Sequence, residues 1–245
     1  MTTISTSPTS SSKHLGVAAV PDLSERLAAV RGGITDAARA ASRDPAELTL
    51  IVVTKFHPVS LIRELAQLGV REMGESRHQE AQAKAAELSG LGLRWHFIGQ
   101  LQSKKARAVR AYADVIHSVD RAALVTALAD PTATAEPIDC FLQVNLTDDP
   151  SRGGVAPAGL SALVEKVAGA PSLKLLGVMA IAPLGEEPRR AFARLRNASD
   201  RLISIVPGAT AISAGMSHDY ADAIAEGATH LRIGSAITGN RPVAG

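Results

Sequence analysis

The sequence predicts an α/β protein of the (β/α)8 TIM-barrel class with one additional helix at its N-terminal end. Eight short runs rich in valine, isoleucine and leucine alternate with helical segments, at about 20 to 30 residues per unit. The first run, residues 48–53, is apolar almost throughout, which is typical of a parallel strand covered on both faces. A doubly wound open sheet is the alternative, but no GxGxxG motif follows the first strand, and such sheets usually have fewer strands.

The expected elements follow one another along the chain. Apolar residues three or four positions apart predict an amphipathic helix over 21–41, with Asp22 or Ser24 as its cap, placed to close the bottom of the barrel. The expected strands are 48–56, 70–75, 94–99, 115–119, 138–146, 173–181, 210–215 and 230–237. The expected helices between them are 61–68, 77–88, 103–112, 122–129, 157–168, 189–206 and 220–226.

Composition and charge restrict the function classes. The chain has 245 residues, 46% of them hydrophobic, which suits one large domain that we place at 21–245. Residues 1–20 are rich in serine and threonine, lack the features of a secretory signal, and are expected to form a disordered tail. A net charge of +2, with no basic run and no membrane-length apolar stretch, argues against nucleic-acid or membrane binding. The single cysteine, Cys140, can form no intrachain disulfide, which fits a cytoplasmic protein.

Lys55 lies at the C-terminal tip of the first expected strand, just before His57 and Pro58 end the element. Barrel proteins place their functional groups at these tips, and the other strand ends of this chain also carry polar side chains. Burial at this position would lower the pKa of the lysine, and a neutral amine can form a Schiff base with an aldehyde. The alternative is a lysine that only ends a strand by reaching water.

Two turns that contain glycine and serine follow the last two strands, SAGMS at 213–217 and RIGS at 232–235. Glycine lets backbone N–H groups approach an anion, and serine hydroxyls add donors, in the loops where barrels commonly bind phosphate. The turns therefore predict a phosphate site. The alternative is a pair of ordinary turns that use glycine for its backbone freedom and serine as a helix cap.

Because a barrel closes its first strand against its last, Lys55 and these two turns are expected to be neighbours. A ligand that carries an aldehyde and a phosphate on one flat ring, pyridoxal 5′-phosphate (PLP), would reach both. Arg232 would then face the pyridine nitrogen and keep it unprotonated, which weakens the ring as an electron sink. The alternative for Arg232 is an ion pair in the barrel wall.

Motifs along nearly the whole chain after the first 20 residues resemble the pyridoxal phosphate homeostasis protein family. They are VTKFHP at 53–58, GESRHQE at 74–80, WHFIGQLQSKKAR at 95–107, HSVDR at 117–121, QVNL at 143–146, GVMAI at 177–181, SAGMS at 213–217 and RIGSAITG at 232–239. The resemblance implies a monomeric or weakly associating barrel like the N-terminal domain of alanine racemase, with PLP held on Lys55 and Arg232 beside the ring nitrogen. It implies a phosphate near Ser213, Gly215, Met216, Ser217, Gly234 and Ser235, and a ring pocket that includes His96, Asn145 and Met179.

The chain departs from the family pattern at four loop positions. Ser76 stands where the family usually has asparagine, so the ligand contact expected from this position is weaker or longer. Lys104 replaces another asparagine, His218 stands where an acidic or amide residue is commoner, and Ala214 stands where methionine is. These departures affect the details of the loops around the expected site and leave the expected ligand unchanged.

The resemblance implies a protein of vitamin B6 metabolism that binds, buffers or delivers PLP, with PLP-dependent apo-enzymes as partners and no catalysis of its own. Racemases of this fold carry a second β-domain with a catalytic base, whereas this chain ends shortly after the eighth expected strand. A PLP-dependent racemase or lyase is the alternative, although Tyr112 and Tyr220 lie at helix ends. A third hypothesis is an aldolase-like barrel, for which Glu75 is the carboxylate candidate.

Overall fold

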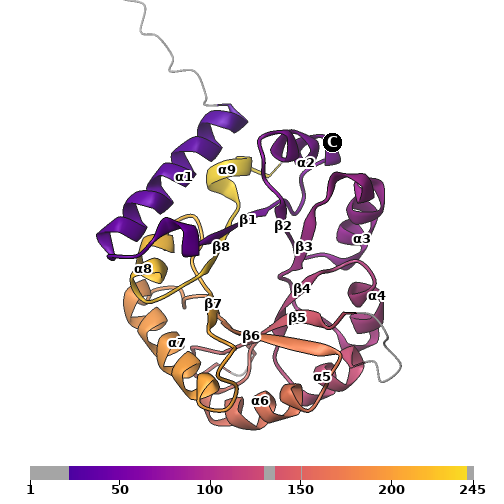
Figure 1. The fold of residues 1–245 in the computed structure, drawn as a ribbon, viewed down its shortest axis with the longest axis vertical. Coiled ribbons are helices and arrows are strands. Elements are labelled where there is room, and N and C mark those ends of the chain that lie inside the picture. Colours follow the sequence, from indigo (N-terminus) through magenta and orange to yellow (C-terminus); the bar gives the residue numbers. More distant parts are fainter. Residues whose placement is uncertain (1–21, 130–135, 150, 242–245) are drawn as a thin grey trace, which may run out of the picture.

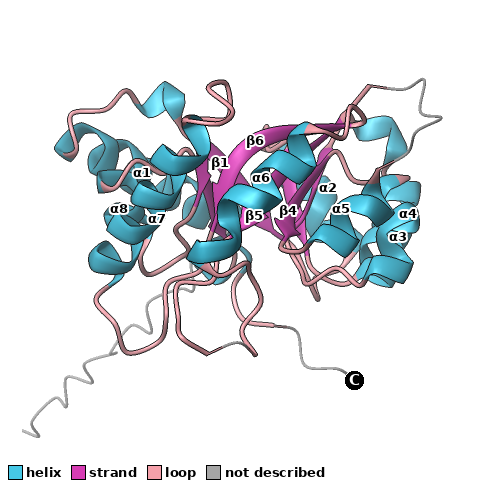
Figure 2. Cartoon of the chain, turned by 90° about the horizontal axis from the view of Figure 1, so that it is seen from below, coloured by secondary structure: helices cyan, strands magenta, loops and turns pink. Residues whose placement is uncertain are grey.

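A computed structural model describes residues 22–129, 136–149 and 151–241 of the chain. Within these residues eight parallel strands close into a barrel in chain order, with β8 hydrogen-bonded back to β1 (Figure 1). Helices surround this barrel on its outside, as the side view in Figure 2 shows. The predicted (β/α)8 class is therefore confirmed. The tail expected over 1–20 lies outside the described residues.

The bounds of the elements agree with the predicted order. The strands are β1 (Thr49–Val53), β2 (Glu72–Glu75), β3 (Arg94–Phe97), β4 (Val115–Val119), β5 (Ile138–Gln143), β6 (Leu173–Met179), β7 (Ala211–Ser213) and β8 (His230–Ile233). The helices are α1 (Leu23–Ala40), α2 (Val59–Gln67), α3 (His78–Glu87), α4 (Ala106–Arg110), α5 (Ala122–Leu128), α6 (Leu160–Ala168), α7 (Pro188–Ile203), α8 (Tyr220–Ala225) and α9 (Ser235–Thr238).

Several strands end earlier than predicted. The prediction for the eighth strand was wrong beyond Ile233. The strand expected over 230–237 stops there because Gly234, with φ −111° and ψ −94°, turns the backbone out of the sheet. The residues that follow form α9. Likewise β1 ends at Val53, so Lys55 belongs to the turn after the strand. Lys55 and Ser76 therefore lie in turns just beyond the strands, whereas Met179 and Arg232 lie within β6 and β8.

Helix α1 forms part of the outer ring, so the expectation that it closes the bottom of the barrel was wrong. It lies against α8 and α9 (Figure 1). Because α9 has only four residues, the helix after β8 covers little of the sheet, and the apolar face of α1 covers the rest. Asp22 caps α1, since its carboxylate accepts a hydrogen bond from the Glu25 N–H (2.8 Å).

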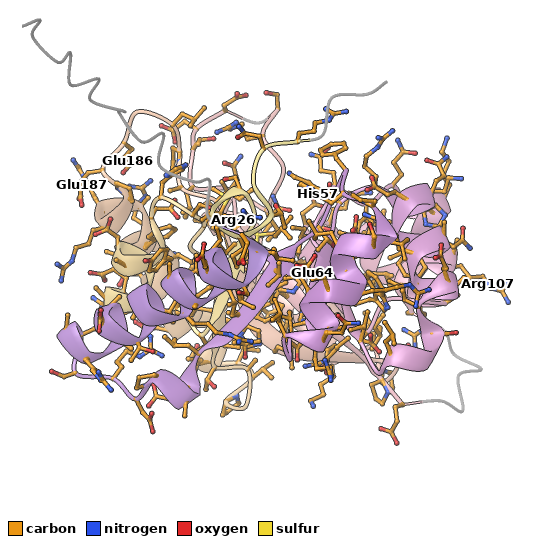
Figure 3. The ribbon with its side chains drawn as sticks, turned by 90° about the horizontal axis from the view of Figure 1, so that it is seen from above. Arg26, His57, Glu64, Arg107, Glu186 and Glu187 are labelled. Atoms are coloured by element: carbon orange, nitrogen blue, oxygen red, sulfur yellow. The ribbon has the colours of Figure 1, made fainter. Side chains whose placement is uncertain are left out.

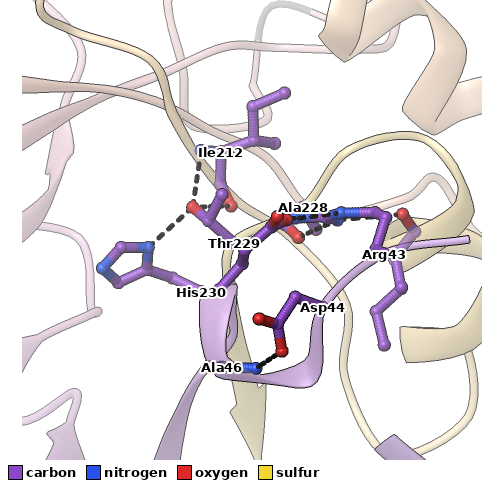
Figure 4. A network of polar contacts seen from close by, with 9 residues as sticks. Arg43, Asp44, Ala46, Ile212, Ala228, Thr229 and His230 are labelled. Carbon is purple, nitrogen blue, oxygen red and sulfur yellow. Dashed lines mark hydrogen bonds and ion pairs between the residues drawn. The ribbon is translucent and has the colours of Figure 1, made fainter. Parts of the chain in front are cut away.

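Arg43, which lies between α1 and β1, connects the first part of the chain to the segment before β8. Its Nη1 donates to the carbonyl oxygens of Ala228 (2.6 Å) and Ile224 (3.1 Å), at the C-terminal end of α8 (Figure 4). Thr229 follows Ala228 in sequence. Its hydroxyl oxygen forms a hydrogen bond with the ring of His230, 2.8 Å from Nδ1. Because these residues lie at the N-terminal ends of β1 and β8, the network closes the barrel at the end opposite the predicted site.

Two separate sets of apolar side chains fill the molecule. The larger set lies between the strands and the helices and includes Cys140 and Leu142 of β5. Phe141 lies between them in sequence and points to the other face, where it packs with Val115 and Met179 in the barrel interior. His117 stacks on Phe141 with ring centroids 4.6 Å apart, so the interior also contains polar groups.

Candidate ligand-binding site

A cavity of about 350 Å3 opens at the C-terminal ends of the strands. Its wall is made from the ends of several strands and from the turns that follow them, and eight of the predicted site residues lie in it. The lining residues are Val53, Lys55, Ser76, Ile98, Met179, Ile181, Met216, Ser217, His218, Arg232, Gly234 and Ser235. Figure 3 shows His57, after β1, and Glu186 and Glu187, after β6, toward this same end of the molecule. The cavity is large enough for a small cofactor.

Lys55 is exposed, which corrects the expectation that burial activates its amine. The backbone around it is held firmly. Phe56 has a left-handed backbone conformation (φ 68°), and its N–H donates to Glu80 Oε1 at 2.5 Å. Thr54 is fully buried, and its hydroxyl donates to Glu75 Oε1 at 2.7 Å. The turn therefore presents the Lys55 amine to the cavity from a fixed backbone.

Lys84 of α3 stabilises this turn through three hydrogen bonds. Its Nζ is buried and donates to the Thr54 carbonyl oxygen (2.9 Å), to Glu75 Oε1 (2.7 Å) and to Glu80 Oε1 (2.7 Å). Burial raises the pKa of Glu75, while the hydrogen bonds from Lys84 and Thr54 oppose that effect. Sequence reasoning missed Lys84 and Glu80, because a Glu–Lys pair four residues apart on a helix usually lies in solvent. The carboxylate of Glu75 faces Lys84, which removes the support for an aldolase-like site.

The expected phosphate site offers fewer groups to an anion than the sequence suggests. Ser217 and Ser235 face each other across the cavity wall, with hydroxyl oxygens 3.5 Å apart, and Gly234 lies beside them. The Ala236 N–H donates weakly to Ser217 Oγ at 3.4 Å. Met216 lines the cavity with an exposed side chain, but its N–H donates to Asp219 Oδ1 at 2.5 Å. Two hydroxyls and a glycine thus remain for an anion.

Ser213 and Gly215, for which the resemblance implies a place near a phosphate, are not among the residues that line the cavity. Ser213 is fully buried, and its Oγ accepts a hydrogen bond from Arg232 inside the barrel. Gly215 has φ 92° and is buried against Tyr220 and Leu231, where a Cβ would come within 2.9 Å of the Tyr220 Cα. Its role is to let the turn after β7 pass close to α8.

Arg232 is a buried cation in the cavity wall. Its Nη1 donates to Ser213 Oγ (2.6 Å) and its Nη2 to the Ala180 carbonyl oxygen (2.9 Å). Burial lowers the pKa of the guanidinium to about 10, so it stays charged at neutral pH. Among the described residues it makes no direct ion pair with a carboxylate, in contrast to the alternative that the sequence left open; Asp219 raises its pKa only through a longer-range electrostatic effect. An amine, three serine hydroxyls and a guanidinium without an ion pair among the described residues fit a small anionic ligand that reacts with amines.

His96 and Asn145, for which the resemblance implies a place in the ring pocket, are also not among the residues that line the cavity. His96 is buried and binds Glu72 and His117 in the barrel interior. The Asn145 amide is fully used within the loop after β5, where Nδ2 donates to the carbonyl oxygens of Asp149 (2.9 Å) and Arg152 (3.3 Å). Its Oδ1 accepts from the N–H and the hydroxyl of Thr147. Sequence reasoning missed the apolar lining residues Val53, Ile98 and Ile181, which only a closed barrel brings together.

No helix in the described ranges is long and apolar enough to cross a membrane. The same residues contain no group of three histidine, cysteine, aspartate or glutamate side chains that could hold a metal ion. The polar groups that line the described cavity include an amine, hydroxyls and a guanidinium.

Comparison with known proteins agrees with this geometry. Residues 27–242 match the family described as the N-terminal domain of alanine racemase. The chain is 43% identical over 223 residues to the pyridoxal phosphate homeostasis protein of Pseudomonas aeruginosa, which covers 89% of this chain and 96% of that protein. It is 39% identical over 227 residues to the protein of that name in Escherichia coli, covering 90% and 97% of the two chains.

Solved structures show the same fold. PipY of Synechococcus elongatus, solved with PLP bound, has a TM-score of 0.77 and 38% identity, and the match covers 89% of this chain and 100% of that one. An alanine racemase from Corynebacterium glutamicum has a TM-score of 0.65 at 18% identity, with 89% and 62% covered, which shows the barrel fold alone. The resemblance found in the sequence motifs is confirmed, and the chain belongs to the pyridoxal phosphate homeostasis protein family.

Proposed function

We propose that this chain binds PLP covalently at Lys55 and holds it as part of intracellular PLP homeostasis, without a reaction of its own. The observation that carries the proposal is the cavity in which the Lys55 amine, the Ser217 and Ser235 hydroxyls and the buried Arg232 guanidinium lie together. The names of the relatives from Pseudomonas aeruginosa and Escherichia coli, and the PLP-bound PipY structure, support the same ligand.

Each group in the cavity has a task that follows from its chemistry. PLP supplies an aldehyde carbon, a phosphate and a heteroaromatic ring when it is bound. The Lys55 amine would hold the aldehyde carbon, and the hydroxyls of Ser217 and Ser235, beside Gly234, would hold the phosphate. Arg232 would interact with the ring nitrogen, and Met179 and Ile98 would cover apolar ring surface, with Ser76 as a further hydroxyl.

The finer aspects of the function are inferred from the same groups. A chain that keeps PLP on an exposed lysine can release it to other amines, which suits buffering or delivery to PLP-dependent apo-enzymes. The single buried thiol of Cys140 suits the reducing cytoplasm. We further propose that residues 21–245 form one domain that acts as a monomer.

Equilibrium binding of PLP tests the proposal. The wild-type chain should bind about one PLP per chain with a shift of the ligand's absorption, and Lys55→Ala should lose this shift and bind far more weakly. Lys166→Ala, which removes an exposed lysine on α6, serves as the matched control and should bind like the wild type. Binding that is unchanged in Lys55→Ala would contradict the proposal.

A PLP-dependent racemase or lyase is the second candidate, because the His218 side chain lines the cavity together with Lys55. An imidazole in the wall of the same cavity would offer the acid–base partner that such a reaction needs. Incubation of the PLP-loaded chain with L-alanine and other amino acids, followed by chiral chromatography, distinguishes the two. Turnover that disappears in both Lys55→Ala and His218→Ala would favour the enzyme, whereas an unchanged amino acid pool favours the carrier.

A further inference from the structure

A continuous row of hydrogen-bonded side chains crosses the barrel interior and ends at Arg232. Glu72 Oε2 lies 2.5 Å from His96 Nε2, and His96 Nδ1 lies 2.9 Å from His117 Nε2. His117 Nδ1 lies 2.9 Å from Ser213 Oγ, which accepts the 2.6 Å hydrogen bond from Arg232. The row passes through β2, β3, β4, β7 and β8. The proposed ligand contacts use only its last member.

The row is sealed from water along most of its length. The imidazoles of His96 and His117 and the hydroxyl of Ser213 have at most 1% of their surface exposed, and Arg232 has 4%. Only Glu72, at the N-terminal end of β2, keeps a quarter of its side chain in solvent (26%). Burial holds the pKa of His117 well below its usual range, so this ring is neutral. A carboxylate thus ends the row near solvent, and a guanidinium ends it in the cavity wall.

When each imidazole carries a single proton, the donors and acceptors fix one direction for these bonds. Arg232 can only donate, so Ser213 Oγ accepts from it and has its own proton free for His117 Nδ1. The proton of neutral His117 is then on Nε2 and is donated to His96 Nδ1, and the proton of His96 is on Nε2 and is donated to Glu72. With two neutral rings, the opposite direction would place an unprotonated His96 Nε2 against the Glu72 carboxylate, where neither atom can donate.

We propose that Glu72, His96, His117 and Ser213 are positioning residues that hold the Arg232 guanidinium in its place in the cavity wall. This inference rests on the proposed function, since it assigns a further task to residues behind the same site. Of the two oxygen atoms that anchor Arg232, the Ala180 carbonyl is fixed by the backbone. The Ser213 hydroxyl can rotate, and only the acceptor at His117 Nδ1 keeps its lone pairs directed at the guanidinium.

The first test measures the protons of the row directly in the chain without added ligand. Long-range proton–nitrogen NMR correlations at neutral pH should show His96 and His117 both neutral and both protonated on Nε2. A proton on Nδ1 of either ring, or an imidazolium at His96, would overturn the assigned direction and with it the proposal. Because this measurement needs no PLP, it is independent of whether the proposed function holds.

The second test measures what the row does for the site. His117→Phe keeps a ring to stack on Phe141 but removes the acceptor, and Ser213→Ala removes the hydroxyl while changing little volume. Each should weaken PLP binding about tenfold, the effect of losing one hydrogen bond to a charged group. The double variant should be no weaker than the weaker single variant, because both remove the same anchor.

His230→Phe is the matched control, because His230 also packs against Phe141 but takes no part in the row. It should bind PLP within about twofold of the wild type. Equal losses in His230→Phe and His117→Phe, or additive losses in the double variant, would reduce the row to ordinary core packing and overturn the proposal. A wild-type chain that binds no PLP would instead contradict the proposed function, so the two failures are distinguishable.

Discussion

Arg232 and Lys84 are both buried cations, and their surroundings give them different tasks. Lys84 is bonded to two carboxylates and a carbonyl oxygen, so its three N–H donors are all used within the protein. Arg232 is bonded to a hydroxyl and a carbonyl oxygen, and among the described residues no carboxylate forms a direct ion pair with it. The carboxylate of Asp219 acts on its charge only at longer range. The charge of Lys84 therefore stabilises the fold, whereas the charge of Arg232 remains available to a ligand.

Replacement of Arg232 should separate ligand binding from stability. In Arg232→Met the buried charge disappears without leaving a carboxylate unpaired, so the free energy of unfolding should fall by no more than about 1 kcal/mol. The affinity for PLP should fall at least tenfold, because the cation that faces the ligand is lost. Urea unfolding and PLP titration measure the two quantities. A variant that binds PLP as well as the wild type would exclude Arg232 from the ligand site.

The two cavity serines give a prediction that distinguishes the phosphate from the rest of the ligand. Ser217→Ala combined with Ser235→Ala removes both hydroxyls that face each other in the wall. Binding of PLP should weaken by about tenfold to a hundredfold, whereas binding of pyridoxal, which has no phosphate, should stay the same. Parallel titrations with the two ligands check this. Equal losses for both would place the phosphate elsewhere.

The turn between β1 and α2 depends on α3, which supplies Lys84 and Glu80. Lys84→Met should lower the free energy of unfolding by about 3 to 5 kcal/mol, because it leaves the buried Glu75 without its charged partner. Urea unfolding at neutral pH measures this loss. The double variant Lys84→Met/Glu75→Gln removes the unpaired charge and should recover part of the stability. No recovery would mean that packing, rather than charge, accounts for the loss.

Histidines at the N-terminal end of the barrel should make the whole molecule sensitive to acid. Burial lowers the pKa of His230 to about 4 from its ordinary value near 6.5. Between these two pH values the unfolded chain binds more protons than the folded chain, so stability falls as the pH drops through this window. The loss from His230 reaches about 3 kcal/mol at most.

Urea unfolding at intervals from pH 7 to pH 4 measures this dependence, and comparison with His230→Phe isolates the contribution of this residue. The variant should lose less stability than the wild type over the same interval. The comparison is needed because the raised pKa of Glu75 acts in the opposite sense, since protonation of this carboxyl favours the folded chain. Parallel pH profiles for the two proteins would contradict the assignment.

The sequence predicted the barrel well because its evidence is local and repeated. Apolar runs such as residues 48–53 and turns such as 232–235 carry their signal in a few neighbouring residues. Lys55, Ser217 and Ser235 could be placed near one another because a closed barrel makes the first and last strands neighbours. The structure departs from the prediction at residues whose place depends on the direction of the side chain. His96 and Ser213 point into the barrel, and Asn145 turns into its own loop.

Contacts between residues far apart in the chain could not be predicted from the sequence, for a physical reason. Lys84 looks like one half of a solvent-exposed pair with Glu80, and only the packing of α3 against β2 buries it beside Glu75. The row from Glu72 to Arg232 joins five strands, each of which contributes one side chain. No spacing along the chain reveals such contacts, because they depend on the register between strands and on the closure of the sheet.

The most direct test of the ligand and its site is borohydride reduction of the chain, as purified and after addition of PLP, followed by peptide mass mapping. Reduction makes a bond between a lysine and PLP permanent, so the modified residue can be identified. We expect a phosphopyridoxyl group on the peptide that contains Lys55 and on no other. No adduct, or adducts spread over exposed lysines such as Lys166, would contradict the account and leave Lys55 as an ordinary residue of a turn.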